Sequence, residues 1–167
     1  MVGKSDIKIT SWNVRGLNNL VKLKQVLGRI RLLKSQIIFL QESHLTDINK
    51  VKKRWPGQIF AAPFNSQARG VIILIHKSIP FRINQEIIDP AGRYIILQGT
   101  ILEVQTTLVN IYGPNEDNHS FFRSLFLTIS SMPGKYVIGG DYNCVLDPVN
   151  DRSSGIDTSH PHTRKLL

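Results

Sequence analysis

Two short, wholly apolar runs constrain the fold of this chain more than any other feature. They are Ile37–Leu40 and Val71–Ile75, far below the ~20 residues that a membrane span needs. Runs of this kind are typical of strands that are covered on both faces. We therefore predict an α/β fold, a mixed sheet with helices packed against it. The 167 residues are expected to form a single domain with one core.

The first forty residues predict a strand, a helix and a second strand. Ile7–Trp12 alternates apolar and polar side chains, as a strand does. Apolar side chains then recur at helical spacing from Leu23 to Leu33, with Asn18 or Asn19 available as the N-cap. The run at Ile37–Leu40 follows, so the order is strand, helix, strand. This order predicts that the first two strands are parallel.

The remainder of the chain alternates between predicted strands, turns and one helix. In chain order we expect a basic polar stretch at Lys50–Arg54, a turn at Trp55–Gly57, a strand at Gly70–His76, antiparallel strands at Tyr94–Gly99 and Thr107–Tyr112, a helix at Ser120–Ser131, and a last strand at Tyr136–Ile138. Residues 151–167 are polar and are expected to form a flexible tail.

The net positive charge of the chain lies in its first third. The net charge is +9, and residues 1–58 hold twelve basic side chains against three acidic ones, while the rest is neutral. A one-sided excess attracts polyanions such as nucleic acid. A solvated helix face with a basic loop explains the same numbers equally well.

One cysteine and the absence of an apolar leader bear on location. Cys144 cannot form an internal disulfide, and the start of the chain lacks the apolar core of a signal peptide. We expect an intracellular protein, nuclear or cytoplasmic, without a membrane partner.

Polar side chains follow four of the predicted strands. They are Asn13, Gln41–Glu42, Tyr112–Asn115 and Asp141–Asn143. Ligands of α/β sheets gather at the carboxyl ends of strands, so these groups are expected to converge. An extended backbone would point Asp141 and Asn143 in the same direction, and the glycine pair before Asp141 permits a close backbone approach. Such an oxygen-rich set suits Mg²⁺ or Mn²⁺.

Each of these residues also has a purely structural interpretation. Asn13 can form a turn, Glu42 can be a solvated strand end, and Asp141 with Asn143 can form an Asx turn. Tyr112 can be a core aromatic residue with its hydroxyl at the rim. No metal-ligand spacing links the histidines, so each is interpreted as a surface or core residue.

The order of the motifs resembles a known family. Ser11–Gly16, Leu40–His44, Asn110–Asn115, Gly139–Asn143 and Asp151–Arg152 occur in succession. This succession resembles the endonuclease domain of non-LTR (long interspersed element) retrotransposons. That domain belongs to the endonuclease/exonuclease/phosphatase superfamily, with the apurinic endonucleases. The resemblance implies a DNase-like four-layer sandwich of two sheets between helices.

The resemblance also implies a reaction and residue roles. Glu42 would be the principal metal ligand, Asn13 would help hold the metal and the phosphate, and Tyr112 would contact the scissile phosphate region. Asp141 would orient or deprotonate the attacking water, and Asn143 would position that water. The reaction would be Mg²⁺- or Mn²⁺-dependent nicking of one DNA strand that leaves a 3′ hydroxyl for reverse transcription, without a small-molecule cofactor. DNA contacts are expected from Arg15, Asn115, Lys22, Lys24 and Arg152.

The sequence departs from the family pattern near its end. The family has a near-terminal Ser-Asp-His triplet whose His contacts the phosphate, and Ser159–His162 does not match it. We therefore expect an incomplete, C-terminally truncated domain with weak or no activity alone and one sheet face without a cover. The partner that covers it would be the missing half or a second copy. The alternatives are a non-catalytic basic nucleic-acid-binding module, a truncated retrotransposon remnant, or, ranked last, a sugar or lipid phosphatase.

Overall fold

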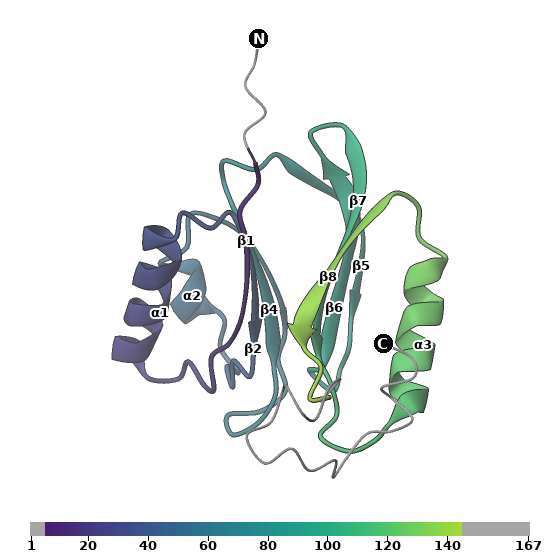
Figure 1. Cartoon of the computed structure of the whole chain (residues 1–167). Coiled ribbons are helices and arrows are strands. Elements are labelled where there is room, and N and C mark those ends of the chain that lie inside the picture. The colour runs from purple at the N-terminus through teal and green to yellow at the C-terminus, as the bar shows by residue number, and fades with distance from the viewer. Residues whose placement is uncertain (1–5, 145–167) are drawn as a thin grey trace, which may run out of the picture.

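Two β-sheets packed face to face form the centre of the protein, with helices on both outer sides (Figure 1). The structure is a computed structural model, and it describes residues 6–144. The four layers are α1 and α2, the first sheet, the second sheet, and α3. This arrangement confirms the predicted α/β sandwich.

The first sheet has the strand order β1-β2-β4-β3. Its strands are β1 (Ile9–Asn13), β2 (Ile37–Gln41), β3 (Gly57–Ala62) and β4 (Val71–His76). β1 pairs parallel with β2, as predicted from the strand–helix–strand order, and the other pairs are antiparallel. The apolar runs lie in the two central strands, β2 and β4.

The second sheet has the order β5-β6-β7-β8. Its strands are β5 (Phe81–Ile88), β6 (Tyr94–Ile101), β7 (Val104–Tyr112) and β8 (Lys135–Asp141). β6 and β7 form the predicted antiparallel hairpin, and β8 joins β7 in parallel. At one side of the sandwich, edge strand β8 lies beside edge strand β1 of the first sheet.

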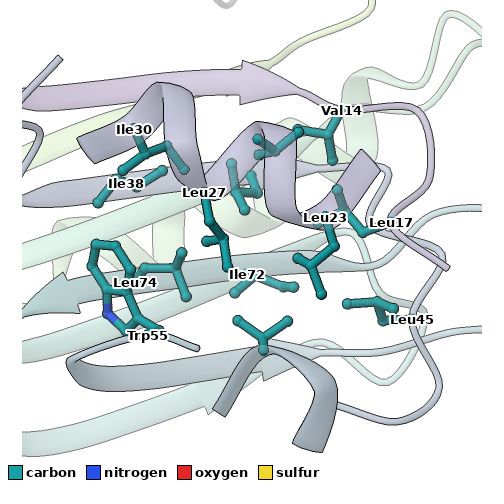
Figure 2. Packing of buried hydrophobic residues seen from close by; sticks show 13 residues of the cluster. Val14, Leu17, Leu23, Leu27, Ile30, Ile38, Leu45, Trp55, Ile72 and Leu74 are labelled. Carbon is teal, nitrogen blue, oxygen red and sulfur yellow. The ribbon is translucent and has the colours of Figure 1, made fainter. Parts of the chain in front are cut away.

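Three helices complete the layers. α1 (Leu20–Leu32) begins at Asn19, whose Oδ1 accepts from two backbone N–H groups, so the predicted cap is confirmed. With α2 (Asn49–Lys52) it buries the outer face of the first sheet, where Leu23, Leu27 and Ile30 pack against Ile38 and Leu74 (Figure 2). α3 (His119–Ser130) covers the second sheet.

The runs in β2 and β4 are apolar because alternate side chains enter different cores. Ile37 and Phe39 face the second sheet, whereas Ile38 and Leu40 face α1. Burying such side chains contributes roughly 1.5–3 kcal/mol each, which is enough to fix the register of a central strand.

Two strands and one short helix differ from the sequence predictions. β3 and β5 are edge strands. β5 is largely exposed and β3 is mostly half-buried, so neither shows the apolar pattern of a strand buried on both faces. Part of the predicted basic loop at Lys50–Arg54 is the short helix α2, because Val51 is buried under α1.

The expectation of an uncovered sheet was wrong. Both sheets are present within residues 6–144, and their inner faces bury each other. The predicted tail at 151–167, Arg152 and the Ser159–His162 segment lie outside the described residues. Within residues 6–144, no helix is long and apolar enough to cross a membrane.

Candidate active site

The ends of β1, β2, β7 and β8 bring the predicted polar residues together at one end of the sandwich. Asn13 is the last residue of β1, Glu42 follows β2, Tyr112 ends β7 and Asp141 ends β8. Because β1 pairs with β2, and β8 pairs with β7, these strand ends approach from both sheets. The predicted convergence is confirmed.

A single amide nitrogen joins the two carboxylates of the site. Asn13 Nδ2 donates to Glu42 Oε1 and to Asp141 Oδ2, each at 2.8 Å. The Asn13 oxygen accepts from the backbone N–H of Arg15 at 3.1 Å. Asn13 thus presents one donor nitrogen to both carboxylates and holds them side by side.

Asp141 is fixed by a second hydrogen bond. Its Oδ1 accepts from the backbone N–H of Asn143 at 3.0 Å, so the Asx turn considered from the sequence is present. Asn143 Nδ2 in turn donates to the carbonyl oxygen of Gly113 at 2.8 Å. Asp141 and Asn143 line one hollow because the chain turns at Asn143 (φ 49°), and not because the backbone is extended as expected.

The glycine pair before Asp141 has the predicted role. Gly140 has a φ of +146°, and a Cβ there would lie 1.9 Å from the carbonyl oxygen of Ile111 on β7. Only glycine therefore allows β8 to run against β7 up to Asp141.

Several residues around the site adopt left-handed backbone conformations without being glycine. Arg15, Glu42, His44, Arg69 and Asn143 have φ values between 47° and 59°. Such conformations cost roughly 1–2 kcal/mol each and persist where the surrounding structure requires them. These conformations are concentrated at the strand ends. This concentration indicates that the backbone turns there so that the side chains of the site lie close together.

Tyr112 lies at the junction of the core and the site. Its side chain packs in the core between the sheets, as the structural interpretation expected, and only 8% of it is exposed. Burial raises the pKa of its hydroxyl, and the neighbouring Glu42 carboxylate raises it further. The hydroxyl therefore keeps its proton at neutral pH.

A buried polar link fixes the two sheets behind the site. Asn110, which is fully buried on β7, accepts from Gln41 Nε2 at 2.7 Å. Its own Nδ2 donates to the carbonyl oxygens of Leu40 and Ile72, at 3.0 and 2.9 Å. Gln41 immediately precedes Glu42, so this link sets the distance between Glu42 and Tyr112.

The predicted DNA-contact residues fall into three groups. Asn115 lines a pocket of about 420 Å³ together with Glu42 and Tyr112. Arg15 is exposed next to the site, and Lys22 Nζ donates to its carbonyl oxygen at 2.8 Å. Lys24 is exposed on α1, away from any contact with the carboxylates.

Comparison with known proteins agrees with this geometry. A profile described as the Endonuclease/Exonuclease/phosphatase family matches residues 10–164. The chain belongs to this family. The family predicted from the motifs is thereby confirmed.

One similar protein and two solved structures show what this family member resembles in sequence and in fold. It is 27% identical over 169 residues to the "Transposon TX1 uncharacterized 149 kDa protein" of Xenopus laevis, which covers 96% of this chain and 13% of that protein. The structure of D. rerio TDP2 complexed with single strand DNA product matches with a TM-score of 0.66 and 22% identity over 83% of this chain and 61% of that one. The endonuclease domain of TRAS1, a telomere-specific non-LTR retrotransposon, matches with a TM-score of 0.59 and 12% identity over 84% and 60%.

The structure adds three residues to the site of this family member. His44, interpreted from the sequence as a surface or core residue, has its Nε2 3.5 Å from Glu42 Oε2. Arg69 and Arg93 line the same pocket as Glu42. His44 could have been found from its place two residues after Glu42, but nothing local in the sequence marks the arginines.

Arg93 is bound to the strand end that carries Tyr112. Its guanidinium donates to the carbonyl oxygen of Gly113 at 3.0 Å and lies 5.8 Å from the centre of the Tyr112 ring. Burial lowers the pKa of Arg93, and the nearby Arg69 lowers it further. Two cations, Arg69 and Arg93, thus line one pocket with two carboxylates, Glu42 and Glu116, and one histidine.

Proposed function

We propose that this protein is a divalent-metal-dependent DNA endonuclease that hydrolyses one phosphodiester bond and leaves a 3′ hydroxyl. The observation that carries the proposal is the shared hydrogen bonding of Glu42 and Asp141 by Asn13, next to the protonated hydroxyl of Tyr112. Membership of the family supports hydrolysis of a phosphate ester. The TX1 and TRAS1 relatives support a place in the retrotransposon branch.

Each side chain has a distinct role in the proposed reaction. Asp141, oriented through both of its oxygens, takes a proton from the attacking water. Asn143 positions that water and the phosphate. The Tyr112 hydroxyl donates to a phosphate oxygen, and Arg93 and Arg69 attract the anionic backbone.

The donor set fits a hard divalent cation. No group of three or more His, Cys, Asp or Glu side chains that could hold a metal occurs in the part of the chain described, residues 6–144. Mg²⁺ needs fewer, because it is commonly held by one or two carboxylates with water and substrate phosphates. Glu42 would hold Mg²⁺ or Mn²⁺, which when bound offsets charge on the phosphate oxygens, and Asp141 keeps its role as the base. A direct contact from Asn13 stays a prediction.

DNA is the proposed partner at this end of the sandwich. Arg15, Lys22 and Asn115 border the site, and Lys24 extends the basic surface along α1. The single strand DNA product bound to the D. rerio relative supports this substrate class.

A plasmid-nicking assay tests the proposal. Supercoiled plasmid is incubated with the protein and Mg²⁺, and with Glu42→Gln, Asp141→Asn and the control Glu86→Gln, an exposed carboxylate on β5. We expect relaxed circles from the parent and from Glu86→Gln, and a loss of about 100-fold or more in both site variants. Equal rates in all four proteins would overturn the assignment.

The same assay addresses the second candidate, a non-catalytic nucleic-acid-binding module. The basic surface favours it, since phosphate binding requires neither carboxylate. DNA binding without nicking in Mg²⁺ or Mn²⁺ would support this module. It would also agree with the predicted need for a histidine supplied elsewhere.

The edge strands suggest where a further partner would join. β1 and β8 each pair on one side only among the described residues, and they expose Ile9, Trp12, Tyr136 and Ile138. The chain spans 60% or 61% of the two structures compared above. We propose that additional strands, from a longer protein or a second copy, pair there, and measurement of the molar mass in solution distinguishes the two sources.

A further inference from the structure

A second pocket lies at the opposite end of the first sheet from the candidate active site. Lys8 and Gln36 line it and directly precede β1 and β2, whereas Asn13 and Glu42 lie at the other ends of those strands. A five-residue strand separates the two ends by about 17 Å. The pocket has a volume of about 450 Å³ and is distinct from the site described above.

The pocket combines an apolar floor with a cationic rim. Ile30 and Trp55 line it and are almost completely buried. Lys8, Arg31 and Lys34 line it as well, and all three are exposed. Asp6 is the carboxylate among the lining residues.

The rim cations are not neutralised by neighbours. Among residues 6–144, none of Lys8, Arg31 and Lys34 forms an ion pair with a carboxylate. Arg31 donates instead to the carbonyl oxygen of Arg54 at 2.9 Å, which holds its guanidinium in place. With Asp6 as the one carboxylate among these lining residues, the three cations leave the concave surface with a net positive charge that attracts an anion.

The floor is held in a defined geometry. Trp55 Nε1 donates to the carbonyl oxygen of Ile75 at 3.3 Å, and His76 meets the indole edge-on at 5.8 Å between ring centres. His76 Nδ1 accepts from the backbone N–H of Ser78 at 3.2 Å, which leaves Nε2 as the donor of the neutral ring. Trp55, His76 and Arg31 are therefore held by contacts within the protein, independently of any ligand.

We propose that this pocket binds a nucleotide, with its phosphate on Lys8, Arg31 and Lys34 and its base against the exposed Pro56 and the edge of Trp55. Inorganic phosphate would satisfy the rim but not the apolar floor, whereas a nucleotide supplies both an anion and a flat apolar ring. The nucleotide is either free or one unit of a single strand. The inference goes beyond the proposed function, because most of the basic excess of residues 1–58 is not used at the candidate active site.

A spectroscopic titration tests the inference without added metal. The chain has two tryptophans, and the indole N–H signals of Trp55 and Trp12 are assigned by comparison with Trp12→Phe. Adenosine monophosphate, a single-stranded oligothymidylate and inorganic phosphate are then added separately. We expect adenosine monophosphate to shift the Trp55 signal in a saturable manner.

Charge-removal variants identify the rim. Arg31→Gln and Lys34→Gln are compared with Lys53→Gln, which is exposed near the same surface but does not line the pocket. We expect each rim variant to weaken nucleotide binding at least about tenfold and the control to change it little. Plasmid nicking by Lys34→Gln should equal that of the parent, so failure here is separable from failure of the proposed function.

The ligands distinguish the outcomes. Tighter binding of the oligonucleotide than of the monophosphate, with the same variant pattern, supports a strand-binding site, and equal binding supports a free nucleotide. Inorganic phosphate binding as tightly as the nucleotide would overturn the inference, since the floor would then contribute nothing. A Trp55 signal that does not shift on addition of nucleotide would also overturn the inference. So would binding of anionic lipid vesicles to Lys8, Arg31 and Lys34 without binding of any nucleotide.

Discussion

Gln41 Nε2 donates to Asn110 Oδ1 at 2.7 Å across the interface between the two sheets. The two residues are buried, at 1% and 0% exposure, and they precede Glu42 and Tyr112 on their respective strands. A shift of one sheet relative to the other would stretch this hydrogen bond, and it would also change the distance between Glu42 and Tyr112. A polar pair in an apolar interface is favourable only when every donor and acceptor is satisfied, so the pair specifies one alignment of the sheets.

Replacement of Asn110 by Leu tests this link. The change removes the donor that Asn110 gives to the carbonyl oxygens of Leu40 and Ile72, and it leaves the Gln41 amide with Ser11 Oγ alone, at 3.2 Å. We expect the free energy of unfolding to fall by about 3 kcal/mol, because buried groups without partners carry the full cost of desolvation. Urea denaturation measures it. Asn84→Leu is the matched control on exposed β5 and should change stability by only about 0.5 kcal/mol.

The bridging nitrogen of Asn13 is the subject of the second prediction. In Asn13→Ala the two carboxylates lose their common donor and repel each other. Loss of a residue that orients a metal-ligating carboxylate typically lowers metal affinity or activity by about 10- to 100-fold. We therefore expect the Mg²⁺-dependent nicking rate to fall by about that factor. Asn18→Ala, in the following loop, serves as the control. An unchanged rate and an unchanged Mg²⁺ requirement would show that Asn13 does not organise the carboxylates.

The left-handed backbone at Asn143 separates a side-chain effect from a backbone effect. Both Asn143→Gly and Asn143→Ala remove the hydrogen bond to Gly113 and should reduce nicking equally. Glycine tolerates a φ of 49°, whereas alanine does not, so Asn143→Ala should be less stable than Asn143→Gly by about 1 kcal/mol. Thermal unfolding of both variants checks the difference, and equal stabilities would contradict it.

The sequence was most informative where a feature lies within one strand, either as a run of buried apolar residues or as polar residues at the strand end. The runs at Ile37–Leu40 and Val71–Ile75 identified central strands, because both faces of a central strand need apolar side chains. The polar ends of those strands identified Glu42 and its neighbours, because strand ends and ligand sites coincide in such folds.

The sequence was least informative where position depends on tertiary contacts. β5 has no apolar pattern because only Phe81, at its start, is buried. The contribution of Arg93 depends on the backbone oxygen of Gly113, which lies twenty residues further along the chain. Neither relationship leaves a local pattern. The side-chain nitrogen of Asn13 points toward the carboxylates. This orientation could not be predicted from the sequence, because it depends on β8 lying beside β1.

Alkaline pH should destabilise the protein through its buried tyrosines. Burial raises the pKa values of Tyr94, Tyr112 and Tyr142 above the ordinary value of 10.0. As the pH rises past that value, the unfolded chain releases protons that the folded chain still holds, so folding stability is complete below it and falls above it. Tyr142→Phe keeps the ring that stacks on Phe122, with 6.0 Å between ring centres. It removes one of the three tyrosine hydroxyls whose pKa is raised. Urea unfolding at neutral pH and above pH 10.0 should therefore show a smaller alkaline loss in Tyr142→Phe than in the parent. Equal losses in the two proteins would mean that the Tyr142 hydroxyl titrates alike in the folded and unfolded chains.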